Sequence, residues 1–570
     1  MQWSRWFPFL RWPRPDAALL RGELTAALTV AVVMVPQSVA YAGLAGMPLV
    51  TGLYATFLPA LAAVLFSGST RLSVGPSALS SVLVGASLVG LAQPATPEWI
   101  ALAVWLALLS GALQIGLGAA GAAWVLNLVS SPVLAGFGQG AALLIIASQL
   151  PALLGLQGPL ASLWQAPHFD PAALAFGVAS VLLFVLGKRF APRLPTVLLV
   201  LGAAAALSWW TGYSAGGAVI GALPVGLPQP YLPPLPPADT LAALLVPALV
   251  ITLVSSLEMA SSAKIESQHD GKRWDAGQDL VGQGMGKLAS ALSGAFPTST
   301  SFSRSAITLY AGARTGWATV LASGVVLGVL LFLTPVLHHV PRSVLAAVVV
   351  TAVAGLVKPQ IIVRLWRIDR VEAVTALVTF AVTVASTPRI YWGVLAGVLL
   401  SLGHFLYLRL HPRIIEVGLH PDGSLRDRHL WNLTQLGARV CALRMDAELD
   451  FASASAFERA LVDHLAAHHD VRHVCLFALP INRVDATGVE VFGQMRRMLA
   501  ERGIHLHVSG LKLPVERVLA KAGVLQPAPL LTMYRTDAEL LAALARLAVP
   551  DPDQALTIQP SSGSSAAGRP

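Results

Sequence analysis

A run of hydroxyl side chains followed by one arginine lies deep in the apolar part of this chain. From Ala295 to Ala306 it reads Ala-Phe-Pro-Thr-Ser-Thr-Ser-Phe-Ser-Arg-Ser-Ala. Serine and threonine favour helix N-caps, and Pro297 is expected to break whatever helix precedes it. The helix that follows is expected to end early, at Gly312. Because a helix N-terminus offers free N–H groups and partial positive charge, the run predicts a site for an anion.

A second segment of the same kind runs from Leu72 to Ser77, with the sequence Leu-Ser-Val-Gly-Pro-Ser. Each of the two short helices is expected to be third in a set of seven spans. Since seven is an odd number, the two sets would insert with opposite topology. Broken helices at matching positions of an inverted repeat are typical of secondary transporters, whose site lies between the half-helices. The alternative is that both breaks are kinks stabilised by neighbouring helices.

The composition predicts a polytopic α-helical membrane protein. Of the 570 residues, 55% are hydrophobic and 12% charged, against about 25% charged in a soluble protein. Arg71 is the only charged residue between Glu23 and Glu98, and none lies between Glu98 and Asp170. About fourteen segments are expected, two of them short, and Pro36 is expected to interrupt the first. They are 24–42, 52–67, 77–91, 99–117, 131–150, 171–187, 196–211, 240–261, 277–296, 303–312, 315–336, 342–357, 370–387 and 390–408.

Loop charge predicts the orientation. With residue 1 in the cytoplasm, the outside connections keep only Arg342 and Arg389. The inside loops then hold Arg71, Lys188, Arg189, Arg193, the run from Lys264 to Arg273, Arg314, the run from Lys358 to Arg370, and the charges from Arg409 onward. This bias predicts a multi-pass protein of the cell inner membrane with both termini cytoplasmic. It also accounts for the net charge of +9 without a nucleic-acid partner.

Changes in composition predict four regions. They are a cytoplasmic N-terminal segment (1–22), a transmembrane transporter domain (23–410), a soluble domain with its linker (411–550) and a disordered tail (551–570). Charged residues become ordinary in frequency only after about residue 409, where a part large enough to fold alone begins. The tail is rich in Pro, Ser, Gly and Ala, which is typical of disorder.

Four further side chains could serve a transport site. Glu258 lies in an apolar span, where acids are costly and tend to be functional; it suits a proton-coupling site or half of a cation site. The alternative is an interfacial residue that faces water near Lys264. Arg304 could balance a bound anion, or could cap carbonyl groups or pair with Glu258. Gln37 and Tyr41, one helical turn apart, could contact a ligand or hydrogen-bond between packed helices.

Nothing in the sequence resembles an enzyme site. Two pairs of adjacent histidines, His338-His339 and His468-His469, point in different directions and do not chelate well. No metal-ligand spacing, nucleotide-binding loop or nucleophile elbow is found. We therefore expect no catalytic residues, no metal and no cofactor.

Several motifs resemble those of the sulfate permease (SulP) family of anion transporters, in family order and over almost the whole chain. They are Val35-Pro-Gln-Ser-Val-Ala-Tyr-Ala42, Gly52-Leu-Tyr, Ser73-Val-Gly-Pro-Ser-Ala78, Ser131-Pro-Val-Leu-Ala-Gly-Phe137, and Phe302-Ser-Arg-Ser305 with Gly312-Ala-Arg-Thr315. The resemblance implies a seven-plus-seven inverted repeat of core and gate domains with an elevator-like movement. It also implies a homodimer.

The same resemblance implies an anion site between the two half-helices. Its residues would be Gln37, Tyr41, Ser77, Ala78, Thr300, Ser301, Phe302, Ser303 and Arg304. Ser77, Ala78 and the residues from Thr300 to Ser303 would present backbone N–H groups. Glu258 falls where some members have an acid for cation coupling. Sodium-coupled bicarbonate carriers of the family tend to have Asp there, so the longer Glu favours a proton.

The soluble part resembles a STAS domain, an α/β unit found in sulfate transporters and anti-sigma antagonists. Its expected strands are 440–445, 474–478 and 504–508, with a helix over 489–501. The run Asp485-Ala-Thr-Gly488 is expected to form the loop before that helix. Anti-sigma antagonists carry a phosphorylated serine just after this Asp, where this chain has Ala486. Cys441 and Cys475 are expected to be free buried thiols.

The sequence thus predicts proton-coupled symport of a small anion across the bilayer. The candidate anions are sulfate, bicarbonate and a dicarboxylate such as fumarate, and the sequence looks closest to the dicarboxylate carriers. One alternative is an uncoupled anion channel or exchanger of the same fold. Another is a membrane-anchored signalling platform whose STAS domain binds a cytosolic partner. A nucleobase is the competing substrate class.

Overall fold

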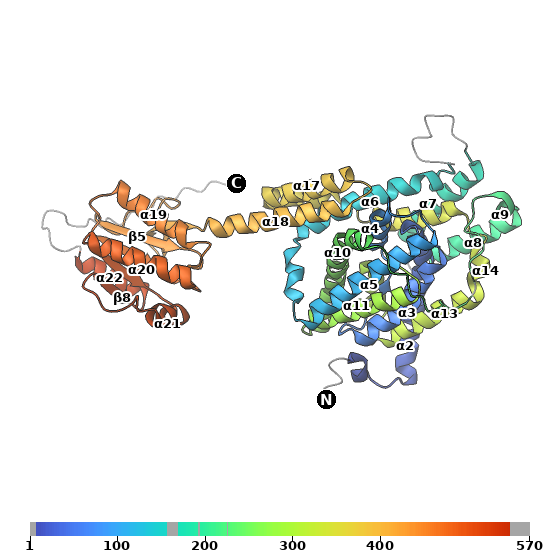
Figure 1. Ribbon diagram of the computed structural model, residues 1–570, viewed down its shortest axis with the longest axis horizontal. Coiled ribbons are helices and arrows are strands. Elements are labelled where there is room, and N and C mark those ends of the chain that lie inside the picture. Colours follow the sequence, from blue (N-terminus) through green and yellow to red (C-terminus); the bar gives the residue numbers. More distant parts are fainter. Residues whose placement is uncertain (1–6, 157–168, 192–193, 225, 548–570) are drawn as a thin grey trace. The chain divides into compact units, whose positions relative to one another are not determined.

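The chain divides into two compact units, Met1–Leu402 and Gly403–Pro570. The computed structural model describes residues 7–156, 169–191, 194–224 and 226–547. The expected tail, 551–570, lies outside the described residues, as do residues 1–6 of the expected N-terminal segment. The first unit is built from helices, and the second holds a six-stranded sheet with helices (Figure 1).

Fourteen helical segments in the described part of the first unit follow the order that the sequence predicted. The first seven are α2 (Ala17–Leu44), α3 (Val50–Phe66), α4 (Ala78–Leu88), α5 (Pro97–Ala119), α6 (Ser131–Leu153), α7 (Pro171–Phe190) and α8 (Thr196–Trp210). The second seven are α10 (Ala238–Asp270), α11 (Ala276–Leu292), α12 (Phe302–Tyr310), α13 (Trp317–Gly328) with its continuation α14 (Thr334–Leu337), α15 (Arg342–Ala354), α17 (Arg370–Ala385) and α18 (Tyr391–Leu410). Shorter helices are η1 (Pro8–Arg11), η2 (Ala123–Leu128), α9 (Tyr213–Gly216) and α16 (Pro359–Ile368).

The lengths of these helices fit a membrane protein with two half-helices. Eight helical stretches of the described residues are long and apolar enough to cross a membrane. The two expected half-helices, α4 and α12, have 11 and 9 residues. At about 1.5 Å of rise per residue, neither can cross the apolar layer of a bilayer.

Two prolines act differently from the expectation. Pro36 lies inside α2, which continues through it, so the predicted interruption of the first span is wrong. The prediction that Pro297 breaks the preceding helix is also wrong, because α11 already ends at Leu292. Gly294 has a φ of 63°. A glycine tolerates this left-handed conformation and commonly ends a helix, so the chain has left α11 before it reaches the proline.

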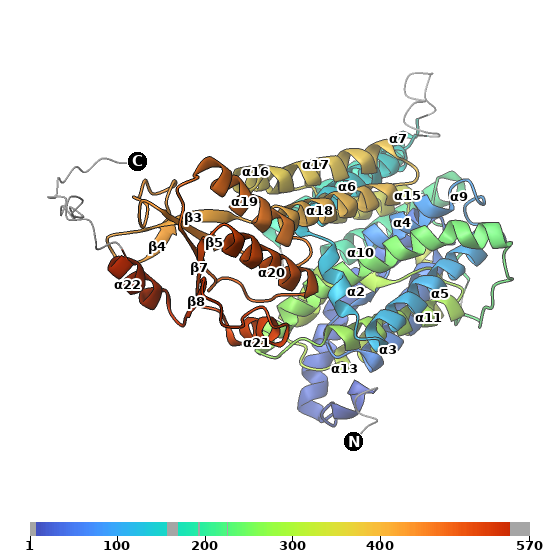
Figure 2. The same ribbon diagram turned by 60° about the vertical axis from the view of Figure 1, so that its left-hand side comes forward.

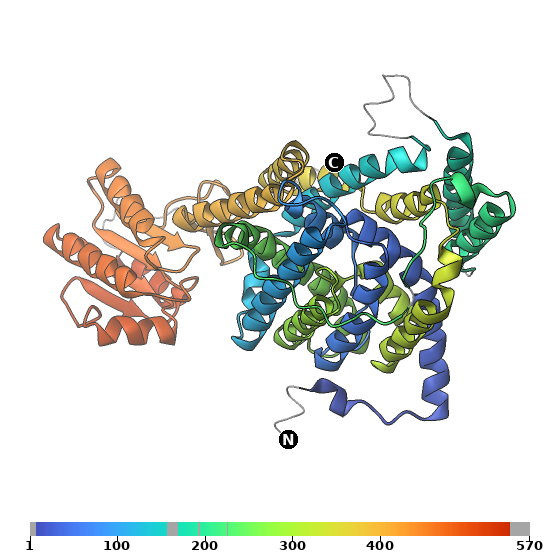
Figure 3. The ribbon, with the colours of Figure 1, turned by 45° about the vertical axis from the view of Figure 1, so that its right-hand side comes forward.

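Helices from the two halves of the sequence interleave. α11 packs against α3 and α5, α10 against α4 and α5, and α13 against α2 and α3. Figure 3 shows this mixture of early blue helices and later green helices. Small residues allow the close approach: a Cβ built at Gly284 of α11 would lie 2.7 Å from the Gly111 carbonyl oxygen of α5. A second group joins α6 with α15 and α17, and α7 with α8 and α15, which gives the expected core and gate.

A pair of two-residue strands precedes the half-helices. β1 (Val74–Gly75) pairs antiparallel with β2 (Ser299–Thr300), so that Val74 lies opposite Thr300 and Gly75 opposite Ser299. α4 and α12 begin a few residues after these strands, from opposite ends of the pair. The sequence did not predict the strands, because two residues show no periodicity.

The second unit contains a sheet in the order β4-β3-β5-β6-β7-β8 (Figure 2). Its strands are β3 (Ile414–Leu419), β4 (Leu425–Asp427), β5 (Val440–Met445), β6 (His473–Phe477), β7 (His505–Ser509) and β8 (Leu531–Tyr534). The strands from β5 to β8 are parallel, and β3 is antiparallel to both neighbours. Side chains of α19 (Ala454–Ala467), α20 (Ala486–Glu501) and α21 (Leu513–Lys521) pack into one apolar cluster with the sheet. α22 (Asp537–Leu547) packs into the other.

The expected strands and helix of this unit are confirmed with small shifts. α20 begins at Ala486 rather than Val489, so the expectation that the residues after Asp485 form a loop is wrong. Asp485 is the N-cap of the helix. Cys441 and Cys475 are free and buried, as expected.

Candidate functional site

The starts of α4 and α12 share one local design. Ser77 is the N-cap of α4, and its side chain accepts a hydrogen bond from Ser80 N over 3.3 Å. Ser301 is the N-cap of α12, and its side chain accepts from Arg304 N over 3.5 Å. Serine is a preferred N-cap because its hydroxyl oxygen satisfies an amide that has no carbonyl within the helix. Other amides of each first turn remain without an intrahelical acceptor, so both helix ends can attract an anion.

The strand pair reduces the number of amides expected to face the anion. Ser301 N donates to Ser73 O over 3.0 Å, and Thr300 lies within β2. The Ser301 N–H is thus already used within the chain, and the prediction that it binds an anion is wrong. The first two residues of α12, Phe302 and Ser303, keep first-turn amides. The Phe302 side chain is 52% exposed, so this residue contributes to a site mainly through its backbone.

Glu258 joins the two half-helix segments. Its Oε2 atom accepts a hydrogen bond from Ser77 Oγ over 2.9 Å and another from Ser299 Oγ. Ser77 caps α4, and Ser299 lies in the strand that leads to α12. The side chain is partly exposed. The alternative of an interfacial residue near Lys264 does not describe these contacts, because Glu258 binds hydroxyls of the candidate site.

Arg304 is fully buried and contacts the residue that precedes β1. Its Nε donates to Ser73 Oγ over 3.2 Å, and among the described residues Nη1 and Nη2 have no hydrogen-bond partner. No direct ion pair joins it to Glu258 within this described part of the chain. A Cβ built at Gly75 would lie 3.3 Å from Nη2, so glycine keeps space above the guanidinium. A buried guanidinium with unpaired nitrogens favours a nearby anion.

Gln37 and Tyr41 lie on α2, the helix that packs against α4 and α12. Gln37 is 9% exposed and Tyr41 6% exposed. Tyr41 lies near enough to Arg304 and Glu258 for their charges to act on its hydroxyl group. Gln37 Oε1 is buried without a hydrogen-bond partner among the described residues. This oxygen favours a polar ligand or a water beside α2 over the alternative of pairing between helices.

Sequence reasoning missed Lys287 of α11. Its side chain is fully buried, and Nζ donates to Ser255 Oγ over 2.7 Å. Gln114 Nε2 donates to Ser255 Oγ over 3.1 Å and to Ser256 Oγ over 2.8 Å. Lys287 is the only charged residue between Asp279 and Arg304. The rule that singled out Glu258, an ionisable residue in an apolar span, would have found it.

Two other buried acids fix the loop before β1. Glu266 accepts from Thr70 N over 2.9 Å and from Arg71 N over 3.2 Å. Asp279 accepts from Ser69 N over 2.8 Å and from Trp274 Nε1 over 2.8 Å. These contacts hold the loop against α10 and α11. They therefore position β1 and, through it, the start of α4.

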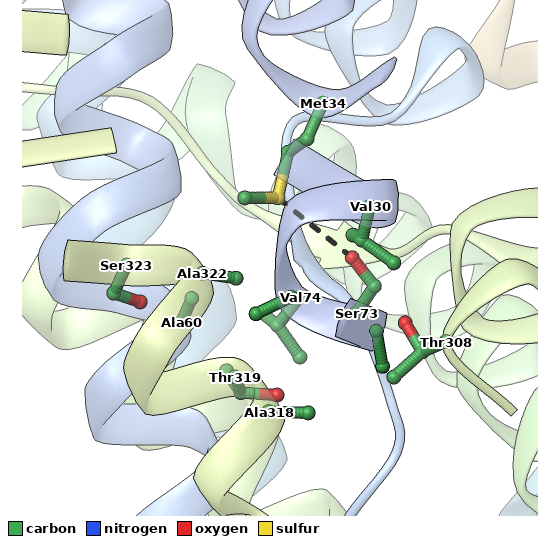
Figure 4. A pocket seen from close by; sticks show the side chains of 12 residues that line it. Val30, Met34, Ala60, Ser73, Val74, Thr308, Ala318, Thr319, Ala322 and Ser323 are labelled. Atoms are coloured by element: carbon green, nitrogen blue, oxygen red, sulfur yellow. Dashed lines mark hydrogen bonds between the residues drawn. The ribbon is translucent and has the colours of Figure 1, made fainter. Parts of the chain in front are cut away.

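A small cavity lies beside the strand pair rather than at the helix ends (Figure 4). Its lining comes from α2, α3, α12 and α13, together with Ser73 and Val74. Ser73 Oγ points toward Met34 Sδ at 3.9 Å. The volume of about 10 Å³ is room for about one water molecule. Because Glu258 does not line it, this cavity is distinct from the candidate anion site.

At the start of α20 in the second unit, a carboxylate of the chain itself binds the helix N-terminus. Asp485 accepts from Gly488 N over 2.9 Å and from Phe451 N over 3.0 Å. Burial acts to raise the pKa of Asp485, but these backbone amides outweigh it and hold that pKa below its usual value. The chain itself supplies the anion at this helix end. The following residue, Ala486, has no hydroxyl that could be phosphorylated.

The fold and this site define a multi-pass membrane transporter for a small anion, not an enzyme. The sulfate permease family matches residues 20–379, and the STAS domain matches residues 434–539. The chain therefore belongs to the sulfate permease family and carries a C-terminal STAS domain, as the resemblance implied.

Curated relatives match most of the chain. A probable sulfate transporter of Mycobacterium tuberculosis (strain CDC 1551 / Oshkosh) is 31% identical over 521 residues, which cover 89% of this chain and 92% of the relative. The chloroplastic sulfate transporter 4.1 of Arabidopsis thaliana is 29% identical over 559 residues, covering 91% and 80%.

Solved structures share the fold. The murine solute carrier 26 family member A9 anion transporter has a TM-score of 0.84 at 21% identity, with 94% of each chain covered. The transmembrane domain of a cyanobacterium bicarbonate transporter has a TM-score of 0.58 at 21% identity, covering 68% of this chain and 99% of that chain. These likenesses show the architecture of the helical unit and, in the murine protein, of both units.

Proposed function

We propose that this chain carries a small anion across the membrane together with a proton, with sulfate as the first candidate. Membership of the sulfate permease family supports anion transport, and both curated relatives named above are called sulfate transporters. Bicarbonate is the second candidate, because a bicarbonate transporter shares the fold. A dicarboxylate such as fumarate, favoured by the sequence, has no support from these relatives and ranks third.

The observation that carries the proposal is the pair of hydroxyl groups on Glu258. Ser77 Oγ and Ser299 Oγ both donate to its Oε2 atom. A hydroxyl can donate to a carboxylate and can also accept from a protonated carboxyl group. Glu258 can therefore bind or release a proton and keep both partners, whereas an acid held by backbone amides cannot.

The position of Glu258 supports coupling between the proton and the anion. Its two hydroxyl partners belong to the segments that begin α4 and α12. A proton on Glu258 removes a negative charge beside the helix ends that would bind the anion. The anion then binds more tightly, and by thermodynamic reciprocity the bound anion strengthens proton binding.

The remaining parts of the proposal rest on the sequence and on the family resemblance. They are an elevator-like movement of the core, location in the inner membrane with both termini cytoplasmic, and a homodimer. Sodium is the competing coupling ion. The length of the Glu258 side chain favours the proton over sodium.

Uptake of labelled sulfate into proteoliposomes tests this function. The purified chain is reconstituted and assayed with no ion gradient, with an inward proton gradient and with an inward sodium gradient. We expect accumulation above equilibrium only with the proton gradient. Accumulation driven by sodium alone would assign sodium as the coupling ion. If uptake is equal in all three conditions and is stimulated by sulfate inside the vesicles, the chain is an exchanger and not a symporter.

A further inference from the structure

Lys287 places a second buried basic side chain close to the candidate site. Its side chain is fully buried, and the contact recorded for Nζ is the 2.7 Å hydrogen bond to the neutral Ser255 hydroxyl. Ser255 precedes Glu258 by one helical turn on α10, so the two residues share a face of that helix. Lys287 and Glu258 interact electrostatically without touching. The lysine thus acts on the acid at a distance.

Four ionisable side chains meet in this part of the core. They are Tyr41 from α2, Glu258 from α10, Lys287 from α11 and Arg304 from α12. Glu258 interacts electrostatically with each of the other three. The residues of α4 are uncharged, and α5 contributes the neutral Gln114 here. The described side chains around Glu258 therefore supply two basic groups and one acid.

The charge of this group decides which anion it suits. With both basic groups protonated and the Glu258 carboxylate ionised, the cluster has one net positive charge. With Glu258 protonated as well, it has two. Because an uncompensated charge in a low-dielectric interior is costly, a site with two positive charges favours a dianion, and a site with one favours a monoanion.

We propose that Lys287 is a positioning residue that sets the charge of the anion site, so that a dianion such as sulfate binds together with one proton on Glu258. This inference rests on the proposed function and adds the charge class of the substrate. Lys287 does not touch the anion. It acts by raising the positive charge of the site and by favouring the ionised form of Glu258 until the dianion arrives.

The variant Lys287→Met tests the inference, because methionine fills a similar volume without charge. Uptake of sulfate and of nitrate, an oxyanion with a single negative charge, is measured over a range of pH in proteoliposomes. We expect the ratio of sulfate to nitrate transport efficiency to fall by about tenfold. We also expect the pH below which sulfate uptake is maximal to rise by about one unit, since Glu258 keeps its proton more easily without the nearby cation.

Two further variants make the result specific. Lys287→Gln makes the same change of charge and can keep a hydrogen bond to Ser255, so it should repeat both shifts. Lys264→Met removes an exposed lysine from the end of α10 and should leave both unchanged. If both Lys287 variants reduce sulfate and nitrate transport by the same factor and leave the pH profile unchanged, the inference is overturned. Lys287 would then serve only in packing.

The outcome for Lys287 can be separated from the outcome for the proposed function. Wild-type uptake that ignores the proton gradient contradicts proton symport, and the sulfate-to-nitrate ratio still tests Lys287. Wild-type uptake that follows the gradient, with an unchanged ratio in both Lys287 variants, contradicts the role of Lys287 alone.

Discussion

The acids of α10 and α11 differ in the groups that hold them. Glu266 is bound by two backbone amides, by the Thr70 hydroxyl and by Arg71. Asp279 is bound by the Ser69 amide and the Trp274 indole as well as by the Ser67 and Ser69 hydroxyls. Glu258 is bound by two serine hydroxyls. Amides and indoles only donate hydrogen bonds, whereas hydroxyls also accept them. Burial of an acid in a membrane helix is therefore weaker evidence of coupling than the kind of donor that holds it.

The energetic consequence follows from that difference. A proton on Glu266 or Asp279 would leave buried N–H donors without an acceptor, at a cost of about 1–3 kcal/mol for each unpaired group. Both acids are thus held as carboxylates that fasten the loop before β1. Glu258 avoids this cost because its partners can reverse their hydrogen bonds.

Glu258→Gln gives the largest expected effect on this comparison. The amide keeps contacts with the hydroxyls but cannot bind a proton. We expect sulfate accumulation driven by an inward proton gradient to fall by more than about tenfold, while exchange of sulfate between equal concentrations continues. Gradient-driven accumulation is measured in proteoliposomes. The folded fraction of the matched variant Glu266→Gln should still respond to the proton gradient. An equal loss of gradient-driven accumulation in both variants would contradict the distinction between the two acids.

Asp279→Asn should lower stability rather than coupling. An asparagine oxygen can accept from Ser69 N or Trp274 Nε1, but its amino group then faces another donor. We expect a loss of about 2–4 kcal/mol in the free energy of unfolding. Thermal unfolding of the purified chain in detergent measures it. A variant as stable as the wild type, yet unresponsive to the proton gradient, would assign Asp279 to coupling and contradict its structural role.

The histidines of the second unit lie in a cluster that opposes protonation of His507. His473 Nδ1 lies 3.1 Å from His507 Nε2, and His507 Nδ1 lies 3.2 Å from the Tyr534 hydroxyl. Protonation turns both ring nitrogens into donors. Burial, followed by repulsion from His505 and His473, lowers the pKa of His507 from 6.5 to about 4.

The lowered pKa of His507 predicts how the stability of the sheet changes with pH. Because the folded pKa lies below the unfolded value, the unfolded chain binds more protons between pH 6.5 and about 4. Stability is therefore present above that window and is lost as pH falls through it, by about 3 kcal/mol. Hydrogen exchange of β6 and β7 in the full chain, corrected for the intrinsic rate, should show less protection at pH 4.5 than at pH 7. A loss of the same size in His507→Gln would contradict this cause.

The substitution Phe302→Pro should have the smallest effect and tests the helix end itself. Proline is tolerated at the first position of a helix, and Ser301 already has the extended conformation that precedes proline, with φ −84° and ψ 117°. The change removes one amide donor, whereas Phe302→Ala removes only the side chain. We expect KM for sulfate to rise by about tenfold in the proline variant and less than about threefold in the alanine variant. Equal KM values would show that the amide does not bind the anion.

The sequence predicted the half-helices and Glu258 because their signals are local. Serine N-caps, a glycine after α12 and an acid in an apolar span can be recognised without knowing which helices touch. The same local reasoning failed at Pro36, where packing keeps α2 helical, and at Pro297, because Gly294 had already ended the helix.

Features that depend on contacts between distant segments could not be predicted. The pairing of Val74 with Thr300 joins strands that lie more than two hundred residues apart in the sequence, and it removes the Ser301 amide from the anion site. The fastening of Ser69 by Asp279 depends on the same fold. Lys287 differs from these, since its charge in an apolar span was visible and only its proximity to Glu258 required the structure.

Proton movement during anion uptake tests the central claim most directly. A pH-sensitive dye inside the proteoliposomes reports acidification when sulfate is added outside at equal pH on both sides. The account predicts acidification with the wild-type chain and none with Glu258→Gln, with sulfate entry measured in parallel. Sulfate entry by the wild type without acidification, or acidification that persists in Glu258→Gln, would contradict it.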